Sequence, residues 1–392
     1  MDRRTFILTT AAAQNRILGA NDRIRATIIG AGGRGRYLTA QFKELGVEMT
    51  GVCDIYEPNL QAGLKEASTG AKSFTDYKRV LEDKSMDAVI VATPDHWHSR
   101  MVIDAVEAGK DVYVEKPMAH KIDEGFDVIQ AVRRTKRVVQ VGMQRRSAEL
   151  FLEAKKIMDS GKLGDIRLVT SAWYNNTSSL SNRQLAGNLN WKQWLGSAPD
   201  RPLDPLRFFN WYYFWDYSGG LLIGQAAHIL DTIQWFMNSK EPLAVTCTGG
   251  KVGLPGAEVP ETASVAIEYP ENYLATFTIG YKAMRYNAFN DQIKQFHGNK
   301  ARLDVGREWY SLYPESNAVE MKASAESKKP GSFNQAAPSH IRNFMECIRS
   351  RKDPNAPVEA GQATNIVLCM TMDSLRKGRR LRWNSAARQV EG

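Results

Sequence analysis

The chain has no uninterrupted apolar run of about 18 residues, the length that a membrane-spanning helix needs. We therefore expect no membrane span. Cysteine is also scarce, because the four thiols stand singly among apolar neighbours, at Cys53, Cys247, Cys347 and Cys369. This pattern is typical of buried thiols and argues against a disulfide framework or a cysteine metal cluster. Cysteine usage therefore gives no sign of an oxidising compartment.

The sequence also has no recognition-helix, zinc-finger or RNP-type signature, although its formal net charge is +9, from 52 basic and 43 acidic residues. The excess is spread along the chain. Its densest patch, from Arg376 to Arg382, ends a helical pattern, where positive charge suits the helix dipole and solvent. We expect no nucleic-acid partner. Hydrophobic content of 43% over 392 residues is typical of a globular protein with two domains.

The first 20 residues have the pattern of a twin-arginine leader, with Arg3 and Arg4 before a short apolar stretch. Leu18, Gly19 and Ala20 resemble a small-residue cleavage site, but Gln14, Asn15 and Arg16 interrupt the apolar stretch. We expect export through the twin-arginine route to the periplasm. The alternative is a degenerate leader on a cytoplasmic protein.

A glycine-rich turn follows the first predicted strand, at residues 25–29, and opens a helix. Gly30, Gly32 and Gly35 form the G-x-G-x-x-G pattern, in which glycines allow a tight turn, close pyrophosphate approach and close helix packing. A second strand ends at Asp54, where an acid binds the ribose 2′-hydroxyl and repels a 2′-phosphate. The pattern predicts NAD rather than NADP. The alternative is a glycine turn without a ligand.

A fully apolar run at residues 88–92 predicts a central parallel strand, and it ends in Thr93-Pro94-Asp95-His96-Trp97-His98. This loop would lie at the same sheet edge as the glycine turn. His96 and His98 suggest a metal pair, but no third ligand stands at a suitable spacing, and we predict no metal.

The strand at residues 112–114 ends in Glu115-Lys116-Pro117. A lysine at the end of a buried strand is costly unless it is paired or used, and proline stops the strand there. Because ligands collect outside the carboxyl ends of parallel strands, Lys116 would face the bound ligand. The alternative is a strand, a turn and a solvated lysine.

The pattern changes after Gly142, and this divides the chain. We predict a leader at 1–20, an NAD-binding doubly wound domain at 21–145, a second α+β domain at 146–385, and a frayed tail at 386–392. Strands at 243–248, 263–269, 273–279 and 292–297 have short connections, which indicates a mainly antiparallel sheet. Residues 175–203 are expected to be a surface loop and residues 322–338 a polar linker.

Eight of the ten residues from Phe208 to Tyr217 are aromatic. Such side chains suit the apolar faces of sugar rings, although core or interface packing is an equal alternative. A helix predicted at 221–236 carries His228 and Asp231 on one face. A histidine on an apolar helix is more often a core residue than a functional one.

Taken together, these motifs resemble the Gfo/Idh/MocA oxidoreductases over residues 24–383. The carrying motifs are the glycine turn, Thr93-Pro94 with His98, Glu115-Lys116-Pro117, the segment from Asn190 to Gly196, and Gly219-Gly220 with His228 and Asp231. The resemblance implies NAD(P) on a Rossmann domain, and a sugar or cyclic polyol on the outer face of an open antiparallel sheet. It also implies a homodimer or homotetramer.

The resemblance assigns roles by position. Lys116 and His228 are the expected catalytic residues. The expected NAD-binding residues are Gly30, Gly32, Gly33, Arg34, Gly35, Asp54, Thr93, Pro94, His98, Glu115, Lys116 and Gln144. The expected substrate-binding residues are Arg145, Trp173, Trp191, Tyr217 and Asp231.

One departure from the family bears on mechanism. Members commonly carry an aspartate four residues before the histidine, where this chain has Gly224. Unless Asp216, Asp231 or another acid replaces it, the histidine is less well oriented and less basic. The reaction then falls to Lys116, or it differs from simple polyol oxidation.

Two enzymatic functions fit these motifs. The first is an NAD-dependent oxidoreductase acting on a secondary alcohol of a sugar, with a tightly bound cofactor. The second is a redox-neutral NAD-dependent glycoside hydrolase that oxidises the sugar at C3 transiently and eliminates the aglycone. A non-enzymatic sugar sensor is disfavoured by the intact Lys116 motif.

Overall fold

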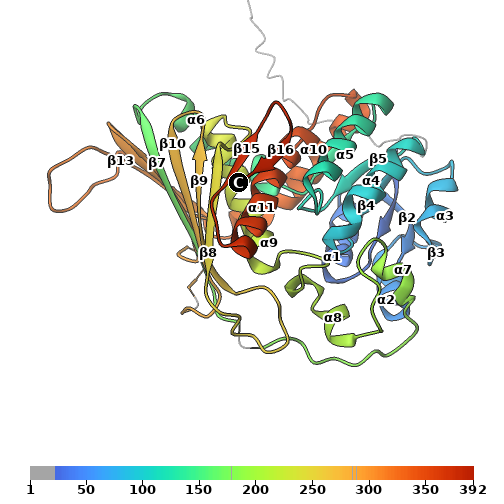
Figure 1. Ribbon diagram of the computed structural model, residues 1–392. Coiled ribbons are helices and arrows are strands. Elements are labelled where there is room, and N and C mark those ends of the chain that lie inside the picture. The colour runs from blue at the N-terminus through green and yellow to red at the C-terminus, as the bar shows by residue number, and fades with distance from the viewer. Residues whose placement is uncertain (1–22, 178, 285, 288) are drawn as a thin grey trace, which may run out of the picture.

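The computed structural model describes residues 23–177, 179–284, 286–287 and 289–392, and the expected leader at residues 1–20 lies outside this range. Two sheets lie side by side with helices between them (Figure 1). The first is a six-stranded parallel sheet in the order β3-β2-β1-β4-β5-β6. The second is a ten-stranded, mainly antiparallel sheet. The predicted fold class is confirmed.

The parallel sheet is a doubly wound Rossmann unit, and its apolar strands are covered on both faces. Its elements are β1 (Arg25–Ile29), α1 (Gly33–Glu44), β2 (Glu48–Cys53), α2 (Glu57–Glu66), β3 (Lys72–Phe74), α3 (Tyr77–Glu82), β4 (Ala88–Val91), η2 (Asp95–Trp97), α4 (His98–Glu107), β5 (Asp111–Val114), α5 (Ile122–Thr135), β6 (Val139–Val141) and η3 (Gln144–Ser147). All residues of β4 and β5 are buried. The strand order reverses between β1 and β4, where such sheets bind ligands.

The larger sheet has the order β14-β13-β12-β11-β7-β10-β9-β8-β15-β16, and only its β7–β10 pair is parallel. This region contains α6 (Glu149–Asp159), β7 (Ile166–Tyr174), α7 (Trp191–Leu195), α8 (Pro205–Phe209), η4 (Trp211–Tyr213), α9 (Gly220–Met237), β8 (Ala244–Gly249), β9 (Thr262–Tyr269), β10 (Tyr273–Gly280), β11 (Gln292–Gly298), β12 (Ala301–Val305), β13 (Trp309–Pro314), β14 (Ala325–Lys328), η5 (Ser332–Gln335), α10 (Ala336–Ser350), α11 (Val358–Lys377), β15 (Leu381–Asn384) and β16 (Gln389–Glu391). One face of the sheet packs on the apolar helix α9.

Three parts of this region differ from the sequence prediction. The sheet continues through β12 and β13, which the sequence analysis does not predict. The expected linker at 322–338 contains β14 and the start of α10, and the expected frayed tail contains β16, which pairs with β15. Strands β14 and β16 are short edge strands rich in polar residues, so their hydrophobic alternation is weak.

Helices α10 and α11 connect the two sheets, although in sequence they lie between β14 and β15 of the second sheet. Ile341 and Phe344 of α10 belong to an apolar cluster with β1 and α1, and α11 contacts both α5 and β8. His340 fixes this joint. Its Nε2 lies 2.9 Å from the carbonyl oxygen of Val141, and its Nδ1 lies 2.7 Å from the hydroxyl of Ser147.

The segment between β7 and α9, residues 175–219, crosses from the large sheet to the Rossmann unit and returns (Figure 1). We call it the cover segment. It contacts Tyr56, the residue just before α2, through an isolated bridge with Leu189, and the Tyr56 and Phe208 rings lie 5.1 Å apart. The sequence predicts a surface loop at 175–203. The structure instead docks this stretch on the Rossmann unit through an aromatic cluster.

No helix in the described part of the chain is both long enough and apolar enough to cross a membrane.

Candidate active site

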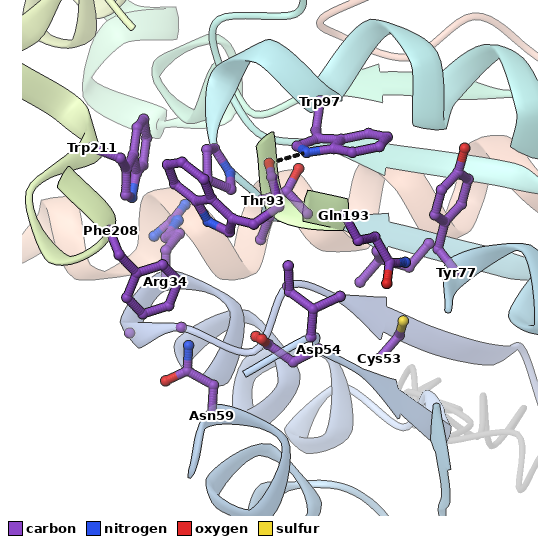
Figure 2. A pocket seen from close by; sticks show the side chains of 18 of the residues that line it. Arg34, Cys53, Asp54, Asn59, Tyr77, Thr93, Trp97, Gln193, Phe208 and Trp211 are labelled. Carbon is purple, nitrogen blue, oxygen red and sulfur yellow. Dashed lines mark hydrogen bonds between the residues drawn. The ribbon is translucent and has the colours of Figure 1, made fainter. Parts of the chain in front are cut away.

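A cavity of about 450 Å³ lies over the carboxyl ends of β1, β2 and β4 (Figure 2). One side is formed by the glycine turn, by Asp54 and by the loop after β4. The other side comes from the cover segment. The predicted cofactor residues that line the cavity are Gly30, Gly32, Gly33, Arg34, Asp54, Thr93 and Pro94.

The glycine turn is shaped to receive an anion. Gly30 has a φ of +91°, and a β-carbon there would lie 2.7 Å from the carbonyl oxygen of Ala92. A β-carbon on Gly35 would overlap the carbonyl oxygen of Gly30, whereas β-carbons on Gly32 and Gly33 would meet nothing within 4 Å. The open space therefore lies at the start of α1, whose cap at Gly32 makes no side-chain hydrogen bond. The free amide groups and the positive end of the helix dipole at the start of α1 are suited to bind the negatively charged pyrophosphate.

Asp54 holds its carboxylate at the edge of this space. It accepts hydrogen bonds from the amides of Ala31 at 2.7 Å and Tyr56 at 2.9 Å. Burial raises the pKa of Asp54, while these hydrogen bonds oppose the increase. Asn59 lies beside it on the cavity wall (Figure 2). A carboxylate fixed here suits a ribose diol and repels a 2′-phosphate, in agreement with NAD.

Aromatic side chains close the cavity from above. Trp97 donates from Nε1 to the carbonyl oxygen of Trp194 at 2.8 Å, which joins the loop after β4 to the cover segment (Figure 2). His96 reaches the same carbonyl oxygen, at 3.1 Å from Nε2. Phe208 and Trp211 line the cavity further along the cover segment. The chain therefore encloses the cofactor position from two sides.

Three predicted cofactor residues lie behind the cavity wall. Glu115 pairs with Arg34, at 2.7 Å, and Gln144 Nε2 lies 3.4 Å from Glu115 Oε1. His98 has its Nδ1 2.6 Å from the carbonyl oxygen of Pro117 and its Nε2 2.9 Å from that of Thr93. These side chains position Arg34 and the two loops, so they support the pocket without lining it.

Lys116 extends from the end of β5 toward α9. Its Nζ donates to the carbonyl oxygen of Gly224 at 3.1 Å. Burial lowers the pKa of Lys116, and the carboxylates of Glu115 and Asp95 only partly offset this. Part of the side chain stays exposed. A lysine with a lowered pKa, whose neighbour Glu115 pairs with the cavity residue Arg34, is suited to proton transfer.

His228 lies one helical turn after Gly224, on the same face of α9. Burial lowers its pKa well below the usual value, and the charges of Lys116 and Arg145 lower it further. Arg145 donates from Nη1 to the carbonyl oxygen of His228 at 3.1 Å, and the Trp173 ring lies 6.3 Å from the imidazole. The structure thus gathers Lys116, His228, Arg145 and Trp173. We call Lys116, Gly224 and His228 the reaction centre.

The structure does not bring three predicted substrate residues to this centre. Asp231 is 1% exposed and pairs with Arg146, at 2.8 Å from Nε to Oδ1. Tyr217 is fully buried in the aromatic cluster of the cover segment. Trp191 stacks on Trp194 at 4.7 Å and donates to the carbonyl oxygen of Arg201. Asp231 therefore does not supply the carboxylate that His228 lacks, and Asp216 pairs with Arg201 and Arg207.

Several cavity residues are absent from the predicted set. They include Asn59, Trp97, Arg183, Gln193, Trp194, Phe208 and Trp211. The dense aromatic run from Phe208 was a signal for some of them. From Phe208 to Tyr213, the aromatic residues of this run lie in two short helices, α8 and η4, and have no regular period. Their spacing in the sequence therefore does not predict which of them line the cavity and which are buried in the core.

Comparison with known proteins identifies the family. Residues 24–143 match the family described as "Oxidoreductase family, NAD-binding Rossmann fold", and residues 151–304 match the "GFO/IDH/MocA C-terminal domain". The chain belongs to the Gfo/Idh/MocA oxidoreductase family. The predicted family, enzyme class and NAD cofactor are confirmed.

Named relatives differ in their activities. Inositol 2-dehydrogenase of Salmonella typhimurium is 26% identical over 279 residues, which are 67% of this chain and 80% of the relative. Glycosyl hydrolase family 109 protein 1 of Akkermansia muciniphila is 27% identical over 180 residues, 44% of this chain and 37% of that protein. A levoglucosan dehydrogenase structure, with NADH and levoglucosan, shares the fold with a TM-score of 0.73 at 16% identity, covering 92% of this chain and 99% of that one.

Proposed function

We propose that the chain is an NAD-dependent dehydrogenase that oxidises a secondary alcohol on a sugar or cyclitol. The observation that carries the proposal is the Lys116 amine, whose pKa is lowered by burial and which binds the Gly224 carbonyl oxygen of α9. Its chain neighbour Glu115 pairs with Arg34, which lines the cofactor cavity. The dehydrogenase named for inositol among the relatives supports the substrate class. NAD, when bound, supplies the hydride acceptor.

The proton chemistry rests on Lys116. Oxidation of an alcohol releases the hydroxyl proton, and a neutral amine is the group that can take it. The lowered pKa of Lys116 makes the neutral form available at lower pH than for a free lysine. His228, also neutral because its pKa is lowered, can hydrogen-bond a neighbouring hydroxyl and orient the ring.

We further propose that NAD stays bound between turnovers. The cover segment closes the cavity through the Trp97–Trp194 hydrogen bond, and it is anchored at Tyr56, just before α2. Both contacts hold the cover segment against the cavity, and we expect them to slow release of the dinucleotide. Retained NAD would have to be regenerated on the enzyme, either by a second substrate or by the same substrate later in the cycle.

The test uses protein purified without added nucleotide. We would add myo-inositol, scyllo-inositol, D-glucose, D-galactose and their nitrophenyl glycosides, and record absorbance at 340 nm together with nitrophenol release. Reduction that stops at one equivalent per site supports the retained-cofactor dehydrogenase. Reduction only after NAD is added supports the dehydrogenase and rejects retention. If neither absorbance at 340 nm nor nitrophenol release increased with NAD present, the result would contradict this substrate class.

The same test separates the second candidate function. A redox-neutral glycosidase would release nitrophenol over many turnovers with little net absorbance at 340 nm. Two observations support this second candidate, namely the relative named as a glycosyl hydrolase and the position of the cofactor cavity beneath the cover segment. The nitrophenyl glycosides are in the assay for this reason.

Two further proposals concern location and assembly. Export by the twin-arginine route is supported by Arg3 and Arg4, and cell fractionation of the full chain against a version with both changed to lysine tests it. A homodimer or homotetramer is supported by Leu168 and Leu274, which pair across β7 and β10 and are 37% and 38% exposed. Sedimentation equilibrium of the purified chain gives the assembly state.

A further inference from the structure

We propose that the Tyr212 hydroxyl is a third catalytic group, which donates a hydrogen bond to the reacting oxygen beside Lys116. This inference rests on the proposed dehydrogenase function and names the group that stabilises charge on that oxygen. The resemblance to the family does not assign it, and the predicted site set does not contain it.

The first observation is the space over Gly224. A β-carbon on Gly224 would coincide with the Tyr212 hydroxyl, so the phenol end of this side chain lies directly against α9. Glycine here is what lets the hydroxyl reach the helix backbone. The position where relatives carry an aspartate is therefore occupied by a tyrosine that comes from η4.

The second observation is the position of Lys116. Its Nζ binds the carbonyl oxygen of the same Gly224, at 3.1 Å, so the amine and the phenol meet at one residue. His228 follows one turn later on the same face of the helix. Lys116, which follows β5, and Tyr212 of η4 therefore approach the short stretch of α9 that also carries His228.

The third observation is accessibility. Lys116, Tyr212 and His228 are all partly exposed, whereas Arg145 and Asp231 are 2% and 1% exposed. A group that meets a substrate must keep an open surface. The Tyr212 ring is also held in place by edge-to-face contacts with Trp211, at 5.4 Å, and Tyr213, at 6.0 Å. Trp211, the preceding residue, lines the cofactor cavity, while the Tyr212 hydroxyl lies against Gly224 of α9.

The charge around Tyr212 decides its role. Burial raises the pKa of Tyr212 well above the usual value, and the nearby Asp95 carboxylate raises it further. The phenol therefore stays protonated and donates. In the oxidation, the C–H electron pair leaves as hydride to NAD, the O–H proton passes to neutral Lys116, and a carbonyl forms. Tyr212 keeps its proton and stabilises the negative charge that develops on the oxygen as the O–H bond breaks.

The test compares Tyr212→Phe with Tyr213→Phe, a neighbouring phenol that the inference leaves out. With the cyclitols and sugars named above, we expect Tyr212→Phe to slow single-turnover reduction of NAD about 100-fold, with NADH affinity unchanged. Tyr213→Phe should stay within about threefold of the unaltered chain. A Tyr212→Phe rate within twofold of the unaltered chain would overturn the inference.

A second readout does not need turnover. 3-Fluorotyrosine is placed at position 212 of the full chain, and its fluorine resonance is followed on addition of NAD and in the Lys116→Met background. We expect the resonance to move in both cases. If the resonance moved neither on addition of NAD nor in the Lys116→Met background, the inference would be overturned even if Tyr212→Phe reduced NAD slowly. If the unaltered chain oxidises none of the compounds, the dehydrogenase proposal fails, and a moving resonance would still support the placement of Tyr212 beside Lys116.

Discussion

The cofactor cavity and the reaction centre of this protein are built in different ways. On the Rossmann side, the cavity is lined by short contiguous motifs, each at the carboxyl end of one strand. The Gly30–Gly35 turn follows β1, and Asp54 follows β2. The reaction centre joins Lys116 of β5 to Gly224 and His228 of α9, more than 100 residues away. Motifs thus encode cofactor binding, whereas the fold assembles the groups for the reaction.

This difference predicts that changes in the two parts have separable effects. A change in the glycine turn should weaken cofactor binding, and a change in the reaction centre should slow turnover while the cofactor stays bound.

Lys116→Met is expected to lower the single-turnover rate of NAD reduction by about 10³-fold, because the proton acceptor is lost. NADH affinity, measured by fluorescence, should change less than threefold. Lys110→Met is the matched control. Its amine is also buried, at the opposite end of β5, where it donates to the carbonyl oxygens of Asp83 and Met86. Equal losses of rate in both variants would make the lysine effect structural.

Asp231→Asn is expected to lower the free energy of unfolding by about 3–4 kcal/mol, because it leaves Arg146 without its buried partner. KM should be unchanged, since the Asp231 side chain is buried in its pair with Arg146 and cannot contact the substrate. Urea unfolding and steady-state kinetics give the two values. A raised KM with unchanged stability would contradict this interpretation and would support the substrate-binding role that the sequence predicts for Asp231.

The joint at His340 is expected to make stability depend on pH. Burial lowers the pKa of His340 to about 4, below the value of 6.5 for an exposed histidine. The unfolded chain therefore binds more protons between these values, so stability is complete above pH 6.5 and falls as pH decreases toward 4. The expected loss is about 3 kcal/mol. Urea unfolding at several pH values should show this slope, and His340→Gln should reduce it. An unchanged slope in that variant would assign the effect to other groups.

Gly32→Ala is expected to weaken NADH binding by about 2 kcal/mol, roughly 30-fold, because its methyl group fills the phosphate space. The stability of the cofactor-free chain should not change, since that methyl group meets nothing within 4 Å. Gly35→Ala is the contrast. Its methyl group would overlap the Gly30 carbonyl oxygen and should lower the melting temperature. Similar melting temperatures for the two variants would contradict this geometry.

The same contrast explains what the sequence could predict. The residues of the glycine turn, Asp54 and Lys116 are recognisable because each role depends on its neighbours in the chain. Tyr212, Trp194 and Tyr217 belong to aromatic stretches without a regular period. Only the packing of the cover segment on the Rossmann unit decides that Trp194 lines the cavity and that Tyr217 is buried. The edge strands β14 and β16 were missed for a similar reason, because pairing rather than local pattern defines them.

In the proposed reaction, Lys116, with its pKa lowered by burial, takes the hydroxyl proton. The most direct test is the pH dependence of single-turnover NAD reduction in the unaltered chain and in Lys116→Met. We expect the rate to rise with pH through one ionisation below the usual lysine pKa of 10.5, and this ionisation to be absent from the residual rate of Lys116→Met. A flat profile, or the same ionisation in both proteins, would contradict the role of Lys116.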